Sequence, residues 1–243
     1  MMNAAFAELG LDWHYLALAV PPANFAETVH ALPGSGYRAA NVTIPHKLAA
    51  LEIADELTES ARAIGAVNTL TLSADGRIEG DNTDAAGLLD ALGDPVPATT
   101  LVLGAGGAAR AAAWALREAG SEVSVWNRTP SRARKLASDL GVSATERPAA
   151  AELLVNATSV GLRADDTLEG LPLVDARVVA DLVYGDRPTP LARWAEERGA
   201  RLVDGLEVLV RQGARSLRVW TGREAPVDAM RRAVVQAASS TSI

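Results

Sequence analysis

The chain has 243 residues, a formal net charge of -7, and 49% hydrophobic and 22% charged residues. This length predicts one large domain or two that share an interface, and the acidic balance argues against a broad basic face for nucleic acid. The absence of cysteine excludes disulfides, thiolate metal sites and cysteine nucleophiles. No stretch reaches the roughly 18 uninterrupted apolar residues of a membrane span, so we expect a cytoplasmic protein with neither a nucleic-acid nor a membrane partner.

The pattern along the chain divides it into successive regions. Residues 1–93 alternate helix-like and strand-like segments, and GDPVP (93–97) is the clearest turn signal. Beyond it, short apolar runs alternate with helix-compatible runs, a βαβ rhythm typical of an α/β protein with a parallel sheet. A buried-face helix is expected over 206–220, a last helix near Pro226, and a frayed tail at SSTSI (239–243). The predicted domains are residues 1–93, 97–205 and 206–243.

The segment NVTIPHK (41–47) places several functional groups close together around a proline. Thr43 is expected to cap a helix whose first turn holds Pro45 and Lys47. Most lysines are solvated surface residues, yet a lysine in a first helical turn opposes the helix dipole. Lys47 is therefore either a solvated residue or a site residue.

Two further polar junctions lie in the same region. GAVNT (65–69) precedes a strand-like run, and GDNTD (80–84) precedes a helix-like one, where Asp84 could serve simply as an N-cap. Three junctions bearing Asn or Thr, one with a lysine and one with an aspartate, favour a site for a polyhydroxylated ligand. A lysine beside a carboxylate can hold or deliver a proton next to a carbinol carbon, as hydride exchange at that carbon requires.

A glycine-rich loop follows the apolar run LVL (101–103). The segment GAGGAA (104–109) reads G-x-G-x-x-A and precedes a long Ala-rich run. Gly104 permits a tight turn, Gly106 lets the backbone approach a pyrophosphate, and the small Ala109 lets helix and strand pack closely. The alternative is a plain small-residue turn, which the strand, helix and next strand in succession disfavour. The loop predicts a dinucleotide site in a Rossmann-type, doubly wound parallel sheet.

The residues after the second strand of this region indicate which dinucleotide binds. NAD-binding versions usually carry an acid about 20 residues beyond the loop, to hold the ribose 2′-hydroxyl. Here the chain has Asn127, Arg128 and Thr129, followed by Arg132 and Arg134. Guanidinium groups favour a 2′-phosphate through charge-assisted, bidentate contacts, so NADP is the predicted cofactor. The alternative, that these arginines only solvate the next helix, applies more readily to Arg134 than to Arg128.

Together these motifs resemble the shikimate dehydrogenase family, the NADP-dependent reductases of 3-dehydroshikimate. The resemblance implies a two-domain α/β fold, with a substrate domain, a Rossmann-type domain and C-terminal helices that pack back on the first domain. It also implies a small-molecule substrate and a monomer or homodimer. The matching segments run in family order over nearly the whole chain: NVTIPHK (41–47), AIGAVNT (63–69), DNTDAAG (81–87), GAGGAARA (104–111), NRT (127–129), NATSVGL (156–162), DLVY (181–184), TPL (189–191) and GLEVLVRQGA (205–214).

The resemblance also implies roles for individual residues. Lys47 corresponds to the catalytic lysine, which gives a proton to the ketone oxygen as hydride arrives, and Asp84 corresponds to its partner. The implied substrate contacts are Asn41, Thr43, Asn68, Tyr184 and Gln212. The implied cofactor contacts are Gly104, Ala105, Gly106, Gly107, Ala108, Asn127, Arg128, Thr129, Arg132, Thr158, Ser159, Val183 and Gly205. No metal is implied, and His14, His30 and His46 lack metal-ligand spacing.

The start of the chain departs from the family pattern. Family members begin with a β-strand and a Ser-x-Ser loop that grips the substrate carboxylate, just before a segment resembling the opening MMNAAF. The serines have no counterpart here. We therefore expect the chain as written to bind the cofactor better than shikimate and to expose an unpaired sheet edge. Shikimate Michaelis constants of this chain and of an N-terminally extended version would test this.

Other functions remain open from the sequence. Within enzymes, the rival is a quinate/shikimate or aminoshikimate dehydrogenase. From another class, the chain could be a cofactor-binding regulator or inactive paralogue with the fold retained. A proton-transfer pair formed by Lys47 and Asp84 argues against a pure binder, which has little use for one.

Overall fold

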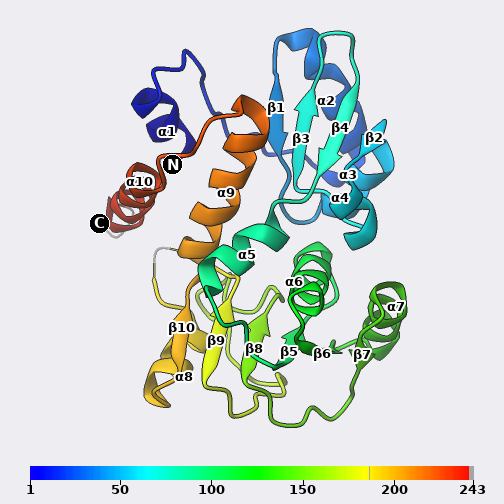
Figure 1. Cartoon of the computed structure of the whole chain (residues 1–243), viewed down its shortest axis with the longest axis vertical. Helices are drawn as coiled ribbons and strands as arrows, with labels where there is room; N and C mark the ends of the chain where they lie inside the picture. Colours follow the sequence, from blue (N-terminus) through cyan, green and yellow to red (C-terminus); the bar gives the residue numbers. More distant parts are fainter. Residues whose placement is uncertain (186, 241–243) are drawn as a thin grey trace.

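The computed structural model describes residues 1–185 and 187–240, which form two sheets with helices around and between them (Figure 1). The first sheet has four strands in the order β1-β3-β4-β2, antiparallel except for the parallel pair β2 and β4. The elements of this first region are α1 (Met2–Glu8), α2 (Phe25–Ala31), β1 (Ala39–Asn41), α3 (Lys47–Ile53), β2 (Glu56–Leu57), α4 (Glu59–Ile64), β3 (Thr69–Leu72), β4 (Ile78–Asp81) and α5 (Asp84–Leu92), with short 3-10 helices at Pro22–Asn24 and Pro33–Ser35.

The second sheet has six strands in the order β10-β9-β8-β5-β6-β7, and every pair is parallel. This confirms the α/β, doubly wound class that the βαβ rhythm predicts. The elements of this second region are β5 (Thr99–Leu103), α6 (Gly107–Glu118), β6 (Glu122–Trp126), α7 (Pro130–Leu140), β7 (Ser143–Ala144), β8 (Leu153–Asn156), β9 (Val178–Asp181), α8 (Pro190–Glu197) and β10 (Arg201–Val203).

Two long helices end the chain and return to the first region, as predicted (Figure 1). Helix α9 (Gly205–Thr221) begins where the Asp204 side chain accepts the Glu207 N–H at 2.9 Å, an N-cap that satisfies a free backbone donor. It packs along α5, and α10 (Val227–Ser240) packs against α9 and α1. The tail 239–243 was expected to fray, but helix α10 extends into it as far as Ser240. Residues 241–243 lie outside the described part of the chain.

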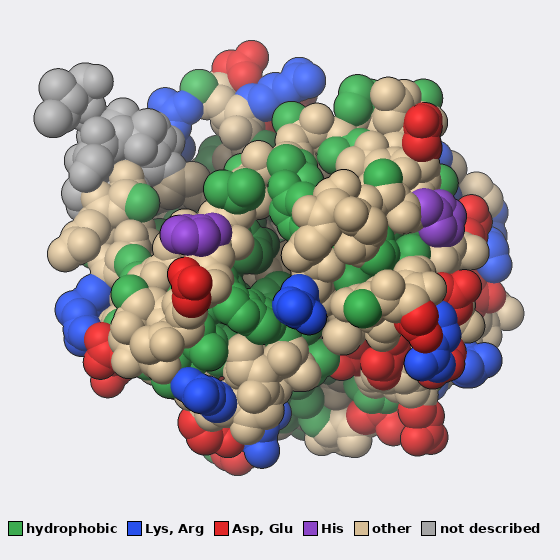
Figure 2. Space-filling view, turned by 90° about the horizontal axis from the view of Figure 1, so that it is seen from above, with side chains coloured by type: hydrophobic (Ala, Val, Ile, Leu, Met, Phe, Trp, Pro, Cys, Tyr) green, Lys and Arg blue, Asp and Glu red, His purple; other side chains and the backbone are tan. Residues whose placement is uncertain are grey.

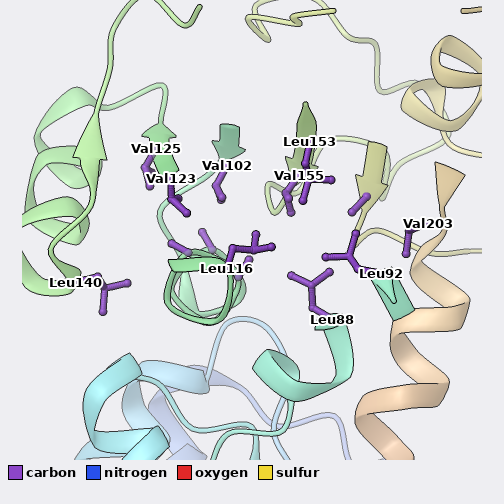
Figure 3. Close-up of a cluster of buried hydrophobic side chains, with 14 of the residues drawn as sticks. Leu88, Leu92, Val102, Leu116, Val123, Val125, Leu140, Leu153, Val155 and Val203 are labelled. Atoms are coloured by element: carbon purple, nitrogen blue, oxygen red, sulfur yellow. The ribbon is translucent and has the colours of Figure 1, made fainter. Parts of the chain in front are cut away.

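Helix α5 belongs to both regions. Its first residue, Asp84, lies beside the first sheet, whereas Leu88 and Leu92 are buried against the second. Figure 3 shows these two leucines facing Leu116 of α6 and the strand valines of the parallel sheet. A single short helix thus fixes the first region relative to the core of the second.

The contact between α5 and α9 is close because one residue has no side chain. A methyl group at Gly87 would lie 2.6 Å from the backbone nitrogen of Gln212, nearer than real carbon atoms approach. Glycine at this position lets the two helix backbones meet directly. The close approach brings Gln212 towards the first sheet.

A guanidinium group also joins the two regions. Arg110 of α6 donates from Nε to the carbonyl oxygen of Ile64 at 2.5 Å, and from Nη1 to Asp139 of α7 at 2.9 Å. Ile64 ends α4 in the first region, and Asp139 lies in the second. Arg110 therefore carries one bond across the interface and one within its own region.

The start of helix α3 differs from the expectation. The helix begins at Lys47, and its N-cap is His46, whose side chain makes no capping bond. Residues 43–46 instead form a turn in which the His46 N–H donates to the Thr43 carbonyl at 2.9 Å. The prediction that Thr43 caps a helix containing Pro45 is therefore wrong, because this turn uses the Thr43 backbone before the helix starts.

The face that carries α1 and β1 is hollowed. Figure 2 shows hydrophobic side chains around a depression near the centre of the view, with one cationic side chain beside it and most other charged groups towards the rim. A cavity of about 530 Å³ lies between residues 12–15 and 35–39 and includes Trp13, Tyr37 and Trp220 in its lining. Strand β1 forms an edge of the first sheet here. Among the described helices, none is long and apolar enough to cross a membrane.

Candidate active site

A cleft with a cavity of about 570 Å³ lies where the first region, the parallel sheet and α9 meet. Its walls come from the ends of β1, α3 and α5 on one side and from loops after β8 and β9 on the other. Both regions thus contribute to one cavity, as expected of a binding site between domains. The predicted site residues in its lining are Asn41, Thr43, Lys47, Asn68, Asp84, Ala108, Thr158, Val183, Tyr184, Gly205 and Gln212.

Lys47 and Asp84 form an ion pair in this cleft. Lys47 Nζ lies 2.5 Å from Asp84 Oδ2, and the two side chains are only 13% and 18% exposed. Each is the first residue of its helix, so α3 and α5 present their N-terminal turns to each other. Lys47 is therefore not a solvated lysine. Nor is Asp84 the N-cap of α5: the cap residue is Thr83, and the Asp84 carboxylate faces the lysine.

Asn68 holds the other oxygen of the carboxylate. Its Nδ2 donates to Asp84 Oδ1 at 2.8 Å and lies 3.2 Å from Gln212 Oε1. Its Oδ1 accepts the backbone N–H of Thr83 at 2.7 Å. A backbone N–H can only donate, so this bond fixes which end of the Asn68 amide faces the carboxylate. Asn68 thereby restrains the orientation of the Asp84 side chain.

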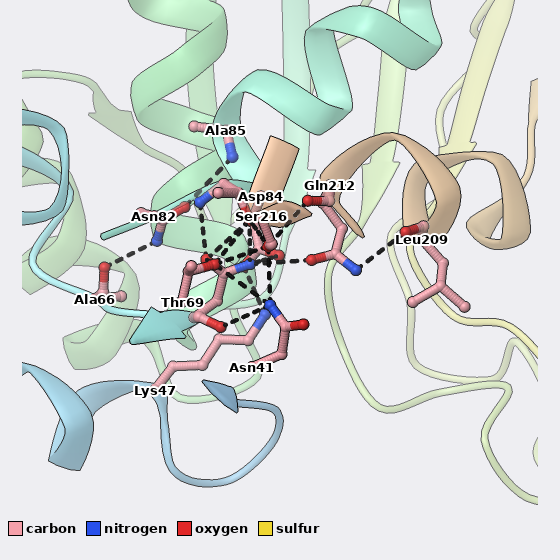
Figure 4. Close-up of polar contacts among 12 residues, drawn as sticks. Asn41, Lys47, Ala66, Thr69, Asn82, Asp84, Ala85, Leu209, Gln212 and Ser216 are labelled. Atoms are coloured by element: carbon pink, nitrogen blue, oxygen red, sulfur yellow. Dashed lines mark hydrogen bonds and ion pairs between the residues drawn. The ribbon is translucent and has the colours of Figure 1, made fainter. Parts of the chain in front are cut away.

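Behind the ion pair lies a cluster of three buried hydroxyl groups that was not predicted from the sequence. Thr69 and Thr83 lie 3.0 Å apart, and Ser216 of α9 lies 2.9 Å and 3.0 Å from them (Figure 4). Asn41 Nδ2 donates to Ser216 Oγ at 2.9 Å. Ser216 therefore bonds α9 to the strand ends of the first sheet. The threonines belong to the polar junctions noted above, whereas nothing in the sequence around Ser216 signals a buried serine.

Two tyrosines border the same cleft. The Tyr15 hydroxyl donates to Asn41 Oδ1 at 3.1 Å, and Tyr184 lies in the loop after β9. Burial raises the pKa of Tyr15, and the neighbouring Tyr184 raises it further. Burial also raises the pKa of Tyr184, with a smaller contribution from the charge of Asp84. Both hydroxyls therefore keep their protons at neutral pH. Tyr15 is a further cleft residue that no sequence motif indicated.

A second cavity, of about 520 Å³, lies beside the glycine-rich loop and shares Lys47, Ala108 and Thr158 with the first. Gly104 has φ of +117°, and a methyl group there would lie 2.7 Å from the Ala157 carbonyl oxygen, so only glycine fits. The backbone at Gly106 has open space, with no atom within 4 Å of a Cβ position. The other predicted cofactor residues that line this cavity are Ala105, Gly107, Asn127, Arg128, Arg132 and Ser159.

These residues fit a dinucleotide with a 2′-phosphate. The loop leads directly into α6, which begins at Gly107, and Gly107 and Ala108 at this helix N-terminus line the cavity. Free N–H groups at a helix N-terminus are suited to hold a pyrophosphate. Arg128 and Arg132 are exposed cations, and the ion pairs in the described part of the chain include neither. Thr129 lines neither cavity: it precedes α7, and its carbonyl accepts Asn127 Nδ2 at 3.0 Å.

A buried aspartate supports the loops on the far wall of the cleft. Asp181, 1% exposed, accepts hydrogen bonds from Thr189 Oγ1 at 2.5 Å, Asn156 Nδ2 at 2.9 Å and the Val183 N–H at 3.1 Å. Burial raises the pKa of Asp181, and these three bonds oppose that rise. Asn156 in turn accepts the Thr158 hydroxyl at 2.7 Å. Asp181 thus connects the two loops that carry Thr158 and Val183.

The described residues contain no group of three or more His, Asp or Glu side chains placed to hold a metal ion. His14 and His30 are exposed side chains.

Comparison with known proteins agrees with the motifs. Residues 1–70 match the shikimate dehydrogenase substrate binding domain, residues 90–160 match shikimate/quinate 5-dehydrogenase, and residues 205–235 match the shikimate 5'-dehydrogenase C-terminal domain. The shikimate dehydrogenase (NADP(+)) of Methanothermobacter thermautotrophicus is 42% identical, over 96% of this chain and 89% of that protein. The enzyme of the same name from Thermus thermophilus is 47% identical, over 90% and 85%.

A solved structure supports the same relationship. Shikimate 5-dehydrogenase from Thermus thermophilus, in complex with NADP(H) and shikimate, has a TM-score of 0.87 and 41% identity, over 97% of this chain and 92% of that one. The motifs, the two-sheet architecture and relatives well above 30% identity over most of the chain all lead to one assignment. The chain belongs to the shikimate dehydrogenase family.

Proposed function

We propose that the protein is an NADP-dependent shikimate dehydrogenase that reversibly reduces 3-dehydroshikimate to shikimate. The observation that carries the proposal is the ion pair of Lys47 and Asp84, 2.5 Å apart, in a cleft whose other wall adjoins the dinucleotide loop. An acid and its counter-charge thus lie where a hydride donor and a polyhydroxylated substrate can meet. The relatives named above act on shikimate with NADP according to their names, which supports the same assignment.

Lys47 is the proton donor in this proposal. NADPH supplies the hydride that reduces the ketone carbon. The Lys47 ammonium gives one proton to the ketone oxygen, which becomes the new hydroxyl group, and the neutral amine takes a proton back when the reaction runs in reverse. Asp84 holds the ammonium through its Oδ2 while Asn68 holds Oδ1, so the donor is oriented before the substrate arrives.

The polar groups around the pair recognise the substrate hydroxyls. Thr43 and Tyr184 line the cleft with hydroxyl groups that both donate and accept hydrogen bonds. Asn41, Asn68 and Gln212 line it too, but all three are already hydrogen-bonded within the protein. We propose that these three hold the site in shape as well as contacting substrate.

The cofactor side selects NADP through its cations. Arg128 and Arg132 hold the 2′-phosphate, with Asn127 beside them, and the backbone of residues 104–108 holds the pyrophosphate. Thr158, Ser159, Val183 and Gly205 border the end of the site where the two cavities meet.

A spectrophotometric assay tests the proposal. NADP+ reduction is followed with shikimate and with quinate as substrates, and NAD+ replaces NADP+ in parallel reactions. We expect turnover of shikimate with NADP+, and a loss of about 100-fold to 10,000-fold in kcat for Lys47→Ala. If wild type and Lys47→Ala were equally slow with every substrate, the chain would be a cofactor binder and the proposal would be wrong.

Quinate is the second candidate substrate. The family description that matches residues 90–160 names both shikimate and quinate, and the assay above compares their kcat/KM values directly. We further propose a cytoplasmic enzyme, since a chain without cysteine suits a reducing compartment, acting as a monomer or homodimer. Light scattering after gel filtration distinguishes the two oligomeric states.

A further inference from the structure

Gly107 of the dinucleotide loop touches the side chain of Lys47. A methyl group at Gly107 would lie 2.8 Å from Lys47 Cβ and 3.2 Å from Lys47 Cδ, with Ala66 Cβ at 3.5 Å. A methyl group at Gly106, one residue earlier, would have no atom within 4 Å. Neighbouring glycines of one loop therefore face different surroundings, one open space and the other a lysine of the opposite region.

The phosphate-binding pattern does not explain a glycine at this position. The pattern G-x-G-x-x-A needs small residues at 104, 106 and 109, and it leaves position 107 free. The backbone at Gly107 does not adopt a positive φ, so its conformation is open to any residue. What requires glycine at 107 is the space taken by the lysine stem.

The rest of the structure leaves Lys47 little freedom. Its carbonyl accepts the Val67 N–H at 2.9 Å, which fixes the backbone, and its ammonium is paired with Asp84. Between these two ends, Gly107 lies against the aliphatic stem. A Cβ at 107 would meet the Cβ of Lys47, which cannot move without its backbone, and the Cδ, whose displacement would carry the ammonium away from Asp84.

We propose that Gly107 is a positioning residue for Lys47. Because it lacks a side chain, the dinucleotide loop can close directly on the lysine stem and keep the ammonium on Asp84. The loop that holds the cofactor thereby also sets the direction of the proton donor. This role rests on the proposed function for its kinetic effect, but the contact itself can be tested without turnover.

The first test is chemical labelling of the lysines in Gly107→Ala. The chain contains only two lysines, Lys47 and Lys135, and Lys135 is 76% exposed, so it serves as an internal reference. Limiting acetic anhydride followed by peptide mapping gives the ratio of Lys47 to Lys135 acetylation. We expect Gly107→Ala to raise this ratio at least threefold, because the displaced amine leaves its ion pair. Gly34→Ala is the matched control, since a methyl group there meets nothing within 4 Å, and its ratio stays at the wild-type value.

The second test is thermal stability in a double-mutant cycle. Gly107→Ala lowers the Tm of the wild-type chain, whereas it has little effect in a Lys47→Gly background, which lacks both lysine atoms that crowd the methyl group. If Gly107→Ala does not fold, recovery of folding in Gly107→Ala/Lys47→Gly supports the proposal. Failure of that double variant to recover, or equal Tm losses in both backgrounds, overturns it.

The third test separates a role in proton transfer from a role in cofactor binding. With saturating NADP+, we expect kcat for shikimate oxidation to fall at least tenfold in Gly107→Ala, while the Kd of NADP+, from tryptophan fluorescence, changes less than threefold. An unchanged kcat with a weaker NADP+ Kd overturns the proposal, as does an unchanged labelling ratio. If wild type does not oxidise shikimate at all, the proposed function fails, and the labelling and Tm results still decide the role of Gly107.

Discussion

The substrate side of the cleft and the cofactor loop are built differently. On the substrate side, side chains bond to one another, from Asn68 and Asp84 through the hydroxyl groups of Thr69 and Ser216. On the cofactor side, glycine backbone groups line the cavity, and Arg128 extends into solvent with no ion pair in the described part of the chain. In a hydrogen-bonded network, a substitution at one residue alters the energetic contributions of its partners, whereas separate groups contribute independently of one another.

This difference predicts how substitutions combine. In the network, the losses of stability or activity caused by substitutions should be strongly coupled and insensitive to salt, because the groups are buried. On the cofactor side, losses should be nearly additive and weaken as salt screens the exposed charges.

Asp84→Asn should produce the largest loss among these. The substitution keeps the size of the side chain and an acceptor for Asn68, but it removes the charge that holds the Lys47 ammonium. We expect kcat to fall about 100-fold, within the range for a positioned acid–base group, with the Kd of NADP+ changed less than threefold. Steady-state kinetics and fluorescence titration measure the two. A kcat within threefold of wild type would show that the ion pair is only structural.

Arg128→Ala should weaken NADP+ and leave NAD+ almost unchanged. Loss of a charge-assisted contact to a phosphate removes about 1.5–3 kcal/mol of binding free energy. We therefore expect KM for NADP+ to rise about tenfold or more. The rise should shrink when the salt concentration is increased. Arg134→Ala is the control, since Arg134 is paired with Glu146 on the surface at 2.8 Å. Equal losses of NADP+ and NAD+ binding would exclude a 2′-phosphate role for Arg128.

Ser216→Ala should affect stability more than chemistry. It removes the acceptor of Asn41 Nδ2 and one of the three buried hydroxyls, at a cost of about 1–3 kcal/mol in the free energy of unfolding. Urea titration measures the loss, and Ser131→Ala on the exposed surface of α7 is the control. Combination with Thr69→Val should cost less than the sum of the two single losses. A strictly additive double variant would contradict the coupled network.

The smallest effect concerns a charge on α9 outside both sites. Arg231, then Arg211, hold the pKa of Glu207 down to about 2. A carboxylate whose pKa is lowered on folding stabilises the protein above its unfolded value of 4.5, and this contribution disappears as the pH falls towards 2. Since the group is partly exposed, we expect Glu207→Gln to cost about 1 kcal/mol at pH 7. Urea titrations at pH 7, 4 and 3 should show the difference from wild type shrinking with acidity; a constant difference would rule out the ionic origin.

The geometry of the glycine-rich loop between β5 and α6 could be predicted from the sequence because its physics is local. Gly104, Gly106 and the small Ala109 serve one turn between a strand and a helix, so adjacent letters carry the whole signal. The pairing of Lys47 with Asp84 could be proposed from the sequence for a different reason. Both residues lie at polar junctions before helices, and folding alone does not require a lysine or an aspartate at these junctions. Their 2.5 Å separation, by contrast, depends on how α3 and α5 meet.

Residues whose role depends on packing between distant segments could not be predicted. Ser216 is 175 positions from its partner Asn41, and it lies on a helix whose sequence pattern marks only the buried face. Tyr15 lies in a segment without regular structure, so no periodicity places its hydroxyl on Asn41. The expected Thr43 cap failed because capping rules do not include the turn that residues 43–46 form before the helix.

Arg110 bears on how easily the cleft can admit its ligands. Its bond to the Ile64 carbonyl crosses between the regions, while its bond to Asp139 stays within the second. If the two regions separated, Arg110 would lose one hydrogen bond, but its guanidinium would not become an unpaired charge. Asp139 belongs to the same region as Arg110, and water can replace the Ile64 carbonyl as a hydrogen-bond acceptor. Separating the two regions at Arg110 would therefore cost about one hydrogen bond to a carbonyl group and would create no isolated charge at the interface.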